Sequence, residues 1–371
     1  MIPASGWLDR WEALGRPFPF LPRWAAALIL ALLAAAMITS VLALPSAGET
    51  PRLPVGSPAV AAPSLPTRAG GDMALYARIH ARVAGGEGYY AAALAEQRAS
   101  NYPTRPFVAV RLPTLAWVQA VVGASGVRVL AIMVAAVGLA VLNGRAVPFA
   151  TLTERLAASL LLILGGGAAL SPLAGYDHDF IAGLLLTLSL LLYRPERWWP
   201  ALLAAGAALA VRELAASFVL VWLAVALAAR RWREAASVAA LLAVSAGVMG
   251  LHFLAVEAGR QNGDLVSQGW SAHSGFGLPL AALAKLTGLR FLPAAVAAPL
   301  AILPLMGWAG LGGRIGLFAV VWFAGLATAM ALFARPENYY WAQLALPAYA
   351  LGLAFSPRGI AELALRVARQ T

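Results

Sequence analysis

The sequence contains no cysteine and very little charge for its length. Of its 371 residues only 12% are charged, whereas 61% are hydrophobic. The absence of cysteine excludes a disulfide framework and any thiol chemistry. A soluble chain of this size needs far more charge to cover its surface. The mean hydropathy of +0.77 therefore predicts an all-α polytopic membrane protein.

Acidic residues and lysine are also scarce. The net charge is +11, and Lys285 is the single lysine, so nearly all of the positive charge is arginine. In a soluble chain this charge would suggest a nucleic-acid partner. In a membrane protein, anchoring to anionic lipid headgroups explains it, and we expect no nucleic acid. The Ala, Leu and Arg bias is typical of a bacterial genome, which places the chain in a bacterial inner (plasma) membrane.

The apolar runs predict about ten transmembrane helices in a single domain, residues 1–371. Several runs are shorter than the ~20 residues that a straight crossing needs, so the helices around 199–229 are expected to bend or stop partway. The predicted spans are residues 24–45, 127–143, 156–174, 179–193, 199–212, 214–229, 235–256, 292–311, 315–334 and 341–356.

The distribution of arginine predicts how the chain is oriented. Arg10, Arg16 and Arg23 precede the first apolar run, which places both termini in the cytoplasm by the positive-inside rule. The basic amphipathic segment 357–371 is then a cytoplasmic tail. Two large loops are expected outside, residues 46–126 and 257–291. The short segments 175–180 and 335–341 are expected on the same side.

The large first loop is expected to contain helices next to the membrane. Residues 45–66 include six prolines and are predicted to form an extended connector. A helix is predicted from Asp72, with Tyr76 one turn later on the same face. Glycines at 85, 86 and 88 are expected to end this helix and to deliver Tyr89 and Tyr90 to the same region.

Several motifs occur in order along residues 24–230: Asp72-x-x-x-Tyr76, Gly88-Tyr89-Tyr90, Tyr102-Pro103, "RLPTLAWVQA" (111–120) and "AVRELAASFVL" (210–220). With one span before a large outer loop, this order resembles the GT-C superfamily of integral-membrane glycosyltransferases. The branch it resembles most is that of protein O-mannosyltransferases and lipid A aminoarabinose transferases. One departure is Met73, at a position where these enzymes often carry a second acid.

The resemblance implies an inverting hexosyl- or pentosyltransferase of cell-envelope glycan biosynthesis. Its donor would be a polyprenyl-phosphate-linked sugar, and its acceptor a lipid, a glycan or a protein outside the cytoplasm. The resemblance implies that Asp72 is the general base, with Tyr76, Tyr89 and Tyr90 in the substrate site. Spacing alone favours a different role, in which Asp72 caps the helix that follows it.

Further candidate residues lie at the other expected outer segments. Asp177, His178 and Asp179 suggest acceptor binding or, as weak candidates, a divalent cation site formed by the two aspartates. The alternative is a helix cap with an acid in the first turn. No cofactor is otherwise implied.

Three cations are candidates for contact with the carrier phosphate. Arg212 lies beside Glu213 in an apolar run, where the two could instead form a structural ion pair. Lys285 and Arg290 suit a phosphate but could equally be interfacial anchors.

Other functions also remain open. An O-antigen ligase or polymerase usually places its large outer loop late in the chain, whereas here the longest loop comes first. A lipid or glycan transporter or flippase would be expected to show matched halves, and no internal repeat is visible. A non-catalytic scaffold would have no evident need for acidic residues at several outer segments.

Overall fold

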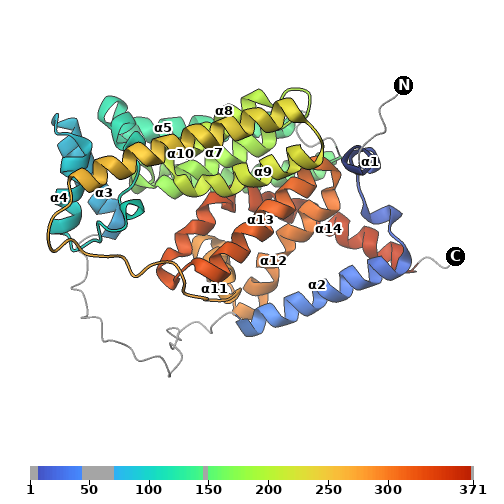
Figure 1. Ribbon diagram of the computed structural model, residues 1–371. Helices are drawn as coiled ribbons and strands as arrows, with labels where there is room; N and C mark the ends of the chain where they lie inside the picture. The colour runs from blue at the N-terminus through green and yellow to red at the C-terminus, as the bar shows by residue number, and fades with distance from the viewer. Residues whose placement is uncertain (1–6, 44–70, 145–148, 369–371) are drawn as a thin grey trace.

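The computed structural model describes residues 7–43, 71–144 and 149–368. In these ranges the chain forms helices joined by turns, and it contains no strand beyond one isolated bridge between Arg105 and Val266. Figure 1 shows the helices packed into one bundle. The all-α fold predicted from composition is confirmed. The predicted connector over residues 45–66 lies outside the described residues.

Six helical segments within the described ranges are long and apolar enough to cross a membrane. This agrees with the prediction of a membrane protein. The helices that carry them are α2 (Arg23–Ala43), α5 (Thr114–Asn143), α6 (Leu152–Gly166), α10 (Trp232–Ala258), α12 (Ala294–Leu311) and α13 (Gly313–Phe333).

The remaining predicted spans fall on helices that do not meet this criterion, so ten crossings remain a prediction. Helices α7 (His178–Leu192), α8 (Trp199–Val211) and α9 (Ala216–Ala228) have 15, 13 and 13 residues. Between α8 and α9 the backbone of Arg212 is extended, with φ −147° and ψ 114°. The break expected in this region therefore falls on Arg212.

The helices expected within the predicted first loop are present in residues 71–99. Helix α3 (Gly71–Ala84) begins where Gly71 adopts a φ of +68°, a conformation that glycine accepts without strain. Helix α4 (Tyr89–Ala99) follows directly after Gly88. Helix α5 begins at Thr114, well before the predicted residue 127, and Gly123 interrupts its helical geometry with a φ of 73°.

The end of the chain also differs from the prediction. The segments 341–356 and 357–371 were expected to be a span and a separate tail, but α14 (Leu346–Ala368) continues through Pro357 as one helix. The short 3-10 helix η7 (Pro336–Leu344) precedes it. Contacts on both sides of Pro357 hold α14 in place: Ser356 donates to the Leu303 carbonyl, and Arg358 pairs with Glu154.

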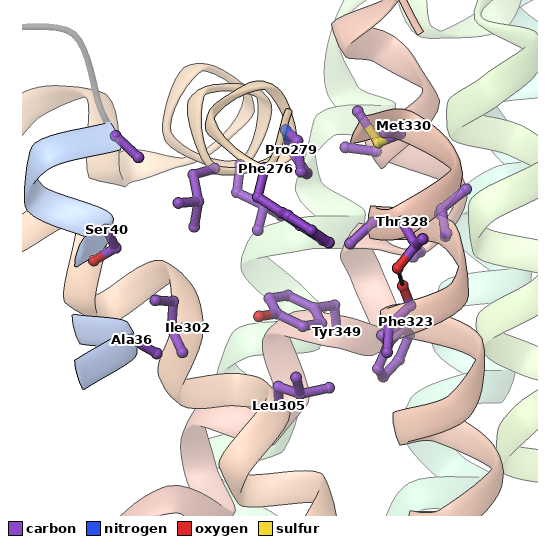
Figure 2. A pocket seen from close by; sticks show the side chains of 18 of the residues that line it. Ala36, Ser40, Phe276, Pro279, Ile302, Leu305, Phe323, Thr328, Met330 and Tyr349 are labelled. Carbon is purple, nitrogen blue, oxygen red and sulfur yellow. Dashed lines mark hydrogen bonds between the residues drawn. The ribbon is translucent and has the colours of Figure 1, made fainter. Parts of the chain in front are cut away.

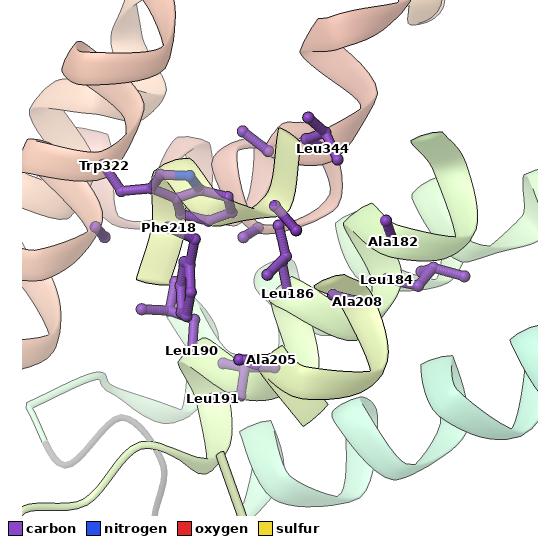
Figure 3. Close-up of a cluster of buried hydrophobic side chains, with 14 of the residues drawn as sticks. Ala182, Leu184, Leu186, Leu190, Leu191, Ala205, Ala208, Phe218, Trp322 and Leu344 are labelled. Carbon is purple, nitrogen blue, oxygen red and sulfur yellow. The ribbon is translucent and has the colours of Figure 1, made fainter. Parts of the chain in front are cut away.

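The core lies where α7, α8, α9 and α13 meet (Figure 3). Helix α7 is apolar on nearly every face, as expected of a helix that is surrounded by others. Small residues of α8, such as Ala205 and Ala208, allow it to approach α7 closely. The rings of Phe218 and Trp322, from α9 and α13, pack with their centroids 4.8 Å apart.

Two groups of helices lie at opposite ends of the bundle. Helices α3 and α4 lie at one end, which we call the α3 end (Figure 1). Helix α1 (Trp7–Leu14) and the end of α14 lie at the other, the α1 end. There the Trp11 indole donates to the Gly313 carbonyl, and Arg16 forms a bidentate pair with Glu362 of α14. The segment predicted as a surface tail therefore packs against the N-terminal region.

If the bundle crosses a membrane, its two ends must face opposite sides. The chain has no cysteine, so single cysteines can report this directly. Asn262 is exposed in the loop after α10, and Thr153 is exposed at the start of α6, beside Phe149 at the α1 end. We expect Asn262→Cys and Thr153→Cys to react with an impermeant maleimide from opposite faces of sealed membranes. Reaction of both from the same face would contradict a spanning bundle.

Candidate functional site

Charged and aromatic side chains from distant parts of the sequence meet at the α3 end. We call this group the charged cluster. It unites α3, the segment before α5, the start of α7, the α8–α9 break and η7. Its members are Asp72, Tyr76, Tyr102, Arg111, His178, Asp179, Arg212, Glu213 and Tyr340.

Two carboxylates hold the guanidinium of Arg212 at the centre of the cluster. Its Nε donates to Asp179 Oδ1 at 2.8 Å, and its Nη1 pairs with Glu213. The Arg212 side chain is only 2% exposed. Arg212 therefore forms the structural ion pair that was considered from the sequence. Its guanidinium is already paired with two carboxylates.

Arg111 connects these charges to α3. Its Nη2 lies 3.9 Å from Asp179 Oδ2, and its Nε donates to the Tyr76 hydroxyl at 3.0 Å. Its guanidinium carbon also lies 5.8 Å from the centre of the Tyr340 ring, a cation–π distance. The side chain retains 12% exposure, so Arg111 can reach a ligand that Arg212 cannot.

Tyr76 lies between Arg111 and the first turn of α3. Burial raises the pKa of Tyr76 to about 12, despite the opposing effect of Arg111. The phenol therefore stays neutral at physiological pH. The Tyr76 ring also packs edge-on against His178, with ring centroids 4.7 Å apart. Because its oxygen accepts from Arg111, its proton can be donated to a ligand.

The surroundings of Asp72 differ from those of the other acids at this end. Its Oδ1 accepts a hydrogen bond from the Tyr102 hydroxyl at 2.7 Å, and no ion pair involves it within the described residues. A neutral donor stabilises a carboxylate less than a cation does. By contrast, several neighbouring acids pair with arginines: Glu87, Glu96, Asp179, Glu213 and Asp264.

A close backbone contact brings η7 to the cluster. A Cβ at Gly183 of α7 would collide with the Gln343 carbonyl oxygen, so only glycine permits this approach. Gln343 Nε2 also donates to Asp177 Oδ2 at 2.9 Å. Together these contacts hold η7 against the start of α7, which positions Tyr340 beside Arg111.

Asp177 is the cap of α7, as the alternative interpretation of this segment predicted. Its Oδ1 accepts from the Phe180 amide at 3.0 Å, and Asp179 is the acid in the first turn. No group of three His, Cys, Asp or Glu side chains in the described ranges is arranged to hold a metal ion. The carboxylates of Asp177 and Asp179 instead bind protein donors.

Tyr89 and Tyr90 contact the backbone that carries Arg111. The buried Tyr89 hydroxyl donates to the Arg111 carbonyl at 2.6 Å. The Tyr90 hydroxyl lies 3.1 Å from His252 Nδ1, and Nε2 of that histidine lies 3.1 Å from the Val110 carbonyl. The two tyrosines therefore help to hold the backbone around Arg111 in place, Tyr89 directly and Tyr90 through His252.

The two other predicted phosphate ligands have different surroundings. Lys285, at the end of α11 (Gly277–Leu286), places Nζ 3.6 Å from the centre of the Tyr339 ring. That ring lies 6.1 Å from Tyr340, which links Lys285 to the cluster through two aromatic rings. Arg290 is exposed and lies over Phe291 at 4.6 Å. No contact within the described residues joins it to the cluster.

The loop between α10 and α11 is tied down near the site. Arg98 of α4 holds Asp264 with two hydrogen bonds, of 2.6 and 3.0 Å. These bonds lower the pKa of Asp264 to about 2. Arg335, just before η7, donates to the carbonyls of Gln268 and Gly269. The loop is therefore fixed to both α4 and η7.

An apolar groove of about 610 Å³ lies beside η7, which contributes Ala342 to its lining (Figure 2). It is bounded by the end of α2, by α11 to α13 and by the start of α14. Four lining residues carry hydroxyls, and each donates to a backbone carbonyl of its own or a neighbouring helix. The bonds are Thr39 to Ala35, Ser40 to Met37, Thr328 to Ala324 and Tyr349 to Ala301.

Because these hydroxyls are already hydrogen-bonded, the lining of the groove offers few polar groups to a ligand. The groove suits a hydrocarbon chain better than a sugar, because a buried sugar hydroxyl needs hydrogen-bond partners. Ala342 of η7 lines the groove, while Tyr340, two residues earlier, contacts Arg111. The groove and the cluster therefore share η7 as a common wall.

Comparisons with protein-family models, with curated proteins and with solved structures find no match to this chain. The chemistry of the cluster and the groove must therefore be interpreted from their own residues.

Sequence reasoning did not select Arg111 as a site residue, and it considered Tyr340 only as one of several aromatics in an outer segment that could stack on a sugar. Arg111 opens the "RLPTLAWVQA" motif, and Tyr340 lies in the "RPENYYW" segment expected at the outer face. An arginine next to a Pro-interrupted turn, just before a long apolar helix, was the available signal for Arg111. Nothing in the sequence indicates that η7 approaches α7.

Removing the Arg212 guanidinium should strongly destabilise the fold. Arg212→Gln removes the cation paired with the buried Asp179 and the partly exposed Glu213, and breaking a buried pair in this way costs about 3–5 kcal/mol. We expect a clearly lower unfolding temperature in detergent, partly recovered by adding Asp179→Asn. The matched control is Arg78→Gln, because Arg78 forms a more exposed pair with Glu96 and such pairs contribute little. Equal stability of Arg212→Gln and the wild type would refute the central role of this pair.

Proposed function

We propose that this protein is an integral-membrane glycosyltransferase that uses a polyprenyl-phosphate-linked sugar. It would transfer the sugar, with inversion, to a hydroxyl of an extracytoplasmic lipid, glycan or protein. The observation that carries the proposal is the position of Asp72. This carboxylate has a neutral hydrogen-bond partner and lies in a cluster with the buried Arg212 and the partly exposed Arg111. Helix η7 separates this cluster from a groove suited to hydrocarbon.

The chemistry requires a base at the acceptor hydroxyl. Asp72 would take the proton as the acceptor oxygen forms a bond to the anomeric carbon. The bond from that carbon to the phosphate oxygen breaks at the same time, and its electron pair leaves with the phosphate. Because the phosphate is already a good leaving group, no second carboxyl is needed as an acid. This agrees with the engagement of Asp179 and Glu213 by Arg212.

Arg111 and Lys285 are the cations best placed for the carrier phosphate. Arg111 retains some exposure beside Tyr76, and Lys285 is exposed on the far side of the two tyrosine rings. Guanidinium and ammonium groups both suit a phosphate oxygen. Tyr339 and Tyr340 between them would offer aromatic faces to the sugar.

The groove behind η7 would hold the start of the polyprenyl chain. It includes Ala342 of η7 and is lined mainly by apolar side chains (Figure 2). A hydrocarbon tail in the groove would place the phosphate near Lys285, which lies in the last turn of α11. The α3 end would face the exterior of a bacterial plasma membrane, because the arginine-rich turns at the α1 end favour the cytoplasm.

The test of catalysis is Asp72→Asn. The amide oxygen still accepts from Tyr102, so we expect unchanged stability, whereas loss of proton acceptance should reduce turnover by about 10²–10⁴-fold. Release of polyprenyl phosphate by the purified enzyme is the readout, with pentosyl and hexosyl donors first screened on the wild type. Tyr102→Phe is the matched control, because it removes the hydrogen bond and keeps the carboxylate. Near-wild-type turnover by Asp72→Asn would end the catalytic assignment.

Recognition of the carrier can be measured without knowing the sugar. We expect Arg111→Gln and Lys285→Gln each to weaken binding of polyprenyl phosphate, because each removes a charge-assisted hydrogen bond, an interaction of about 1.5–3 kcal/mol. Arg290→Gln should have a smaller effect, since Arg290 lies outside the cluster. Isothermal titration in detergent measures all three. The phosphate is held elsewhere if the first two variants bind as tightly as the wild type.

A further inference from the structure

A second hollow lies at the α1 end, away from the charged cluster. It has a volume of about 540 Å³ and is formed by the turn before α8 and the turn before α10. Every residue that lines it is charged or a tryptophan. We call it the Trp–Arg hollow, and its lining residues are Glu196, Arg197, Trp198, Trp199, Arg231, Trp232, Arg233 and Glu234.

The hollow is positively charged overall. Its lining carries three arginines and two glutamates, a net charge of +1, and Arg194 and Arg230 lie in the same two turns. Glu234 is turned inward: it is 1% exposed, accepts from the Trp222 indole at 2.6 Å and pairs with Arg231. Arg197 and Arg233 are exposed. The cations that face outward are thus suited to an anion, and guanidinium groups bind phosphate oxygens well.

The tryptophans indicate that the anion belongs to an amphiphile. Trp199 and Trp232 are 51% and 66% exposed, and exposed indoles favour the boundary between hydrocarbon and water. Arg197 lies 5.4 Å from the centre of the Trp199 ring, which holds its guanidinium at this level. Leu203 of α8 and Leu227 of α9 continue an exposed apolar surface along the neighbouring helices.

We propose that the Trp–Arg hollow binds the phosphate of an anionic phospholipid, with Arg197 and Arg233 as its ligands. The acyl chains then lie against the exposed leucines of α8 and α9. The site is independent of the proposed transferase reaction, because α10 starts at the α1 end and the charged cluster lies at the α3 end (Figure 1).

The test measures lipid preference in the purified full chain. The protein is mixed with equal amounts of phosphatidylglycerol and phosphatidylcholine, and retained lipid is counted by native mass spectrometry. We expect the wild type to retain phosphatidylglycerol preferentially. Arg197→Gln/Arg233→Gln should reduce the preference about thirtyfold, the order expected for two basic residues beside an anionic headgroup. Arg197→Lys/Arg233→Lys should retain most of it.

Arg10→Gln/Arg23→Gln is the matched control, because it removes two exposed cations at the same end of the bundle. This control should keep the preference. An equal loss in the control and in the hollow variant would overturn the proposal, since any cation would then suffice. Absence of a preference in the wild type would also overturn it. Complete displacement of phosphatidylglycerol by millimolar inorganic phosphate would show a plain anion site, not a lipid site.

Discussion

The buried guanidinium of Arg212 constrains the whole α3 end of the molecule. A charge in an apolar helical run costs at least about 2.5–3.5 kcal/mol, so it must find acids or water. Here it finds Asp179 on α7 and Glu213 in its own turn. Meeting both requires the break between α8 and α9, which places the Arg212 side chain against the start of α7. The short helices around residues 199–228 follow from this requirement.

The same pairing determines which charged side chains remain available to a ligand. Arg212 and its two acids satisfy one another, and Arg111 shares Asp179 from the other side. Asp72 is left with a neutral tyrosine as its partner, and Arg111 with partial exposure. The Asp72 carboxylate and the Arg111 guanidinium are thus not paired with each other. In the proposed reaction this would let Asp72 accept a proton while Arg111 holds an anion.

The sequence predicted those features that depend on local pattern. Apolar runs located most of the long helices, and the helix starting near Asp72 followed from glycine and periodicity. The sequence also grouped Asp72, Tyr76, Asp179 and Arg212 as site residues, and the structure brings these four together. This agreement concerns placement, and their roles remain proposals.

The features that escaped prediction depend on contacts between distant segments. Arg111 became central only because Tyr89 and His252 fix the backbone around it. Helix α14 continues through Pro357 because Arg358 and Ser356 have partners on other helices. Such partners are set by tertiary packing and leave no periodic signal in the sequence.

One small contact has a mechanical consequence. At Gly183 the backbone of α7 touches the carbonyl of Gln343, with no side chain between them to absorb a displacement. This contact restricts movement of η7 toward α7. Ala342 lines the groove and Tyr340 contacts Arg111, so a sideways shift of η7 would change the groove and the contact with Arg111 together. The groove and the charged cluster are therefore mechanically linked through η7.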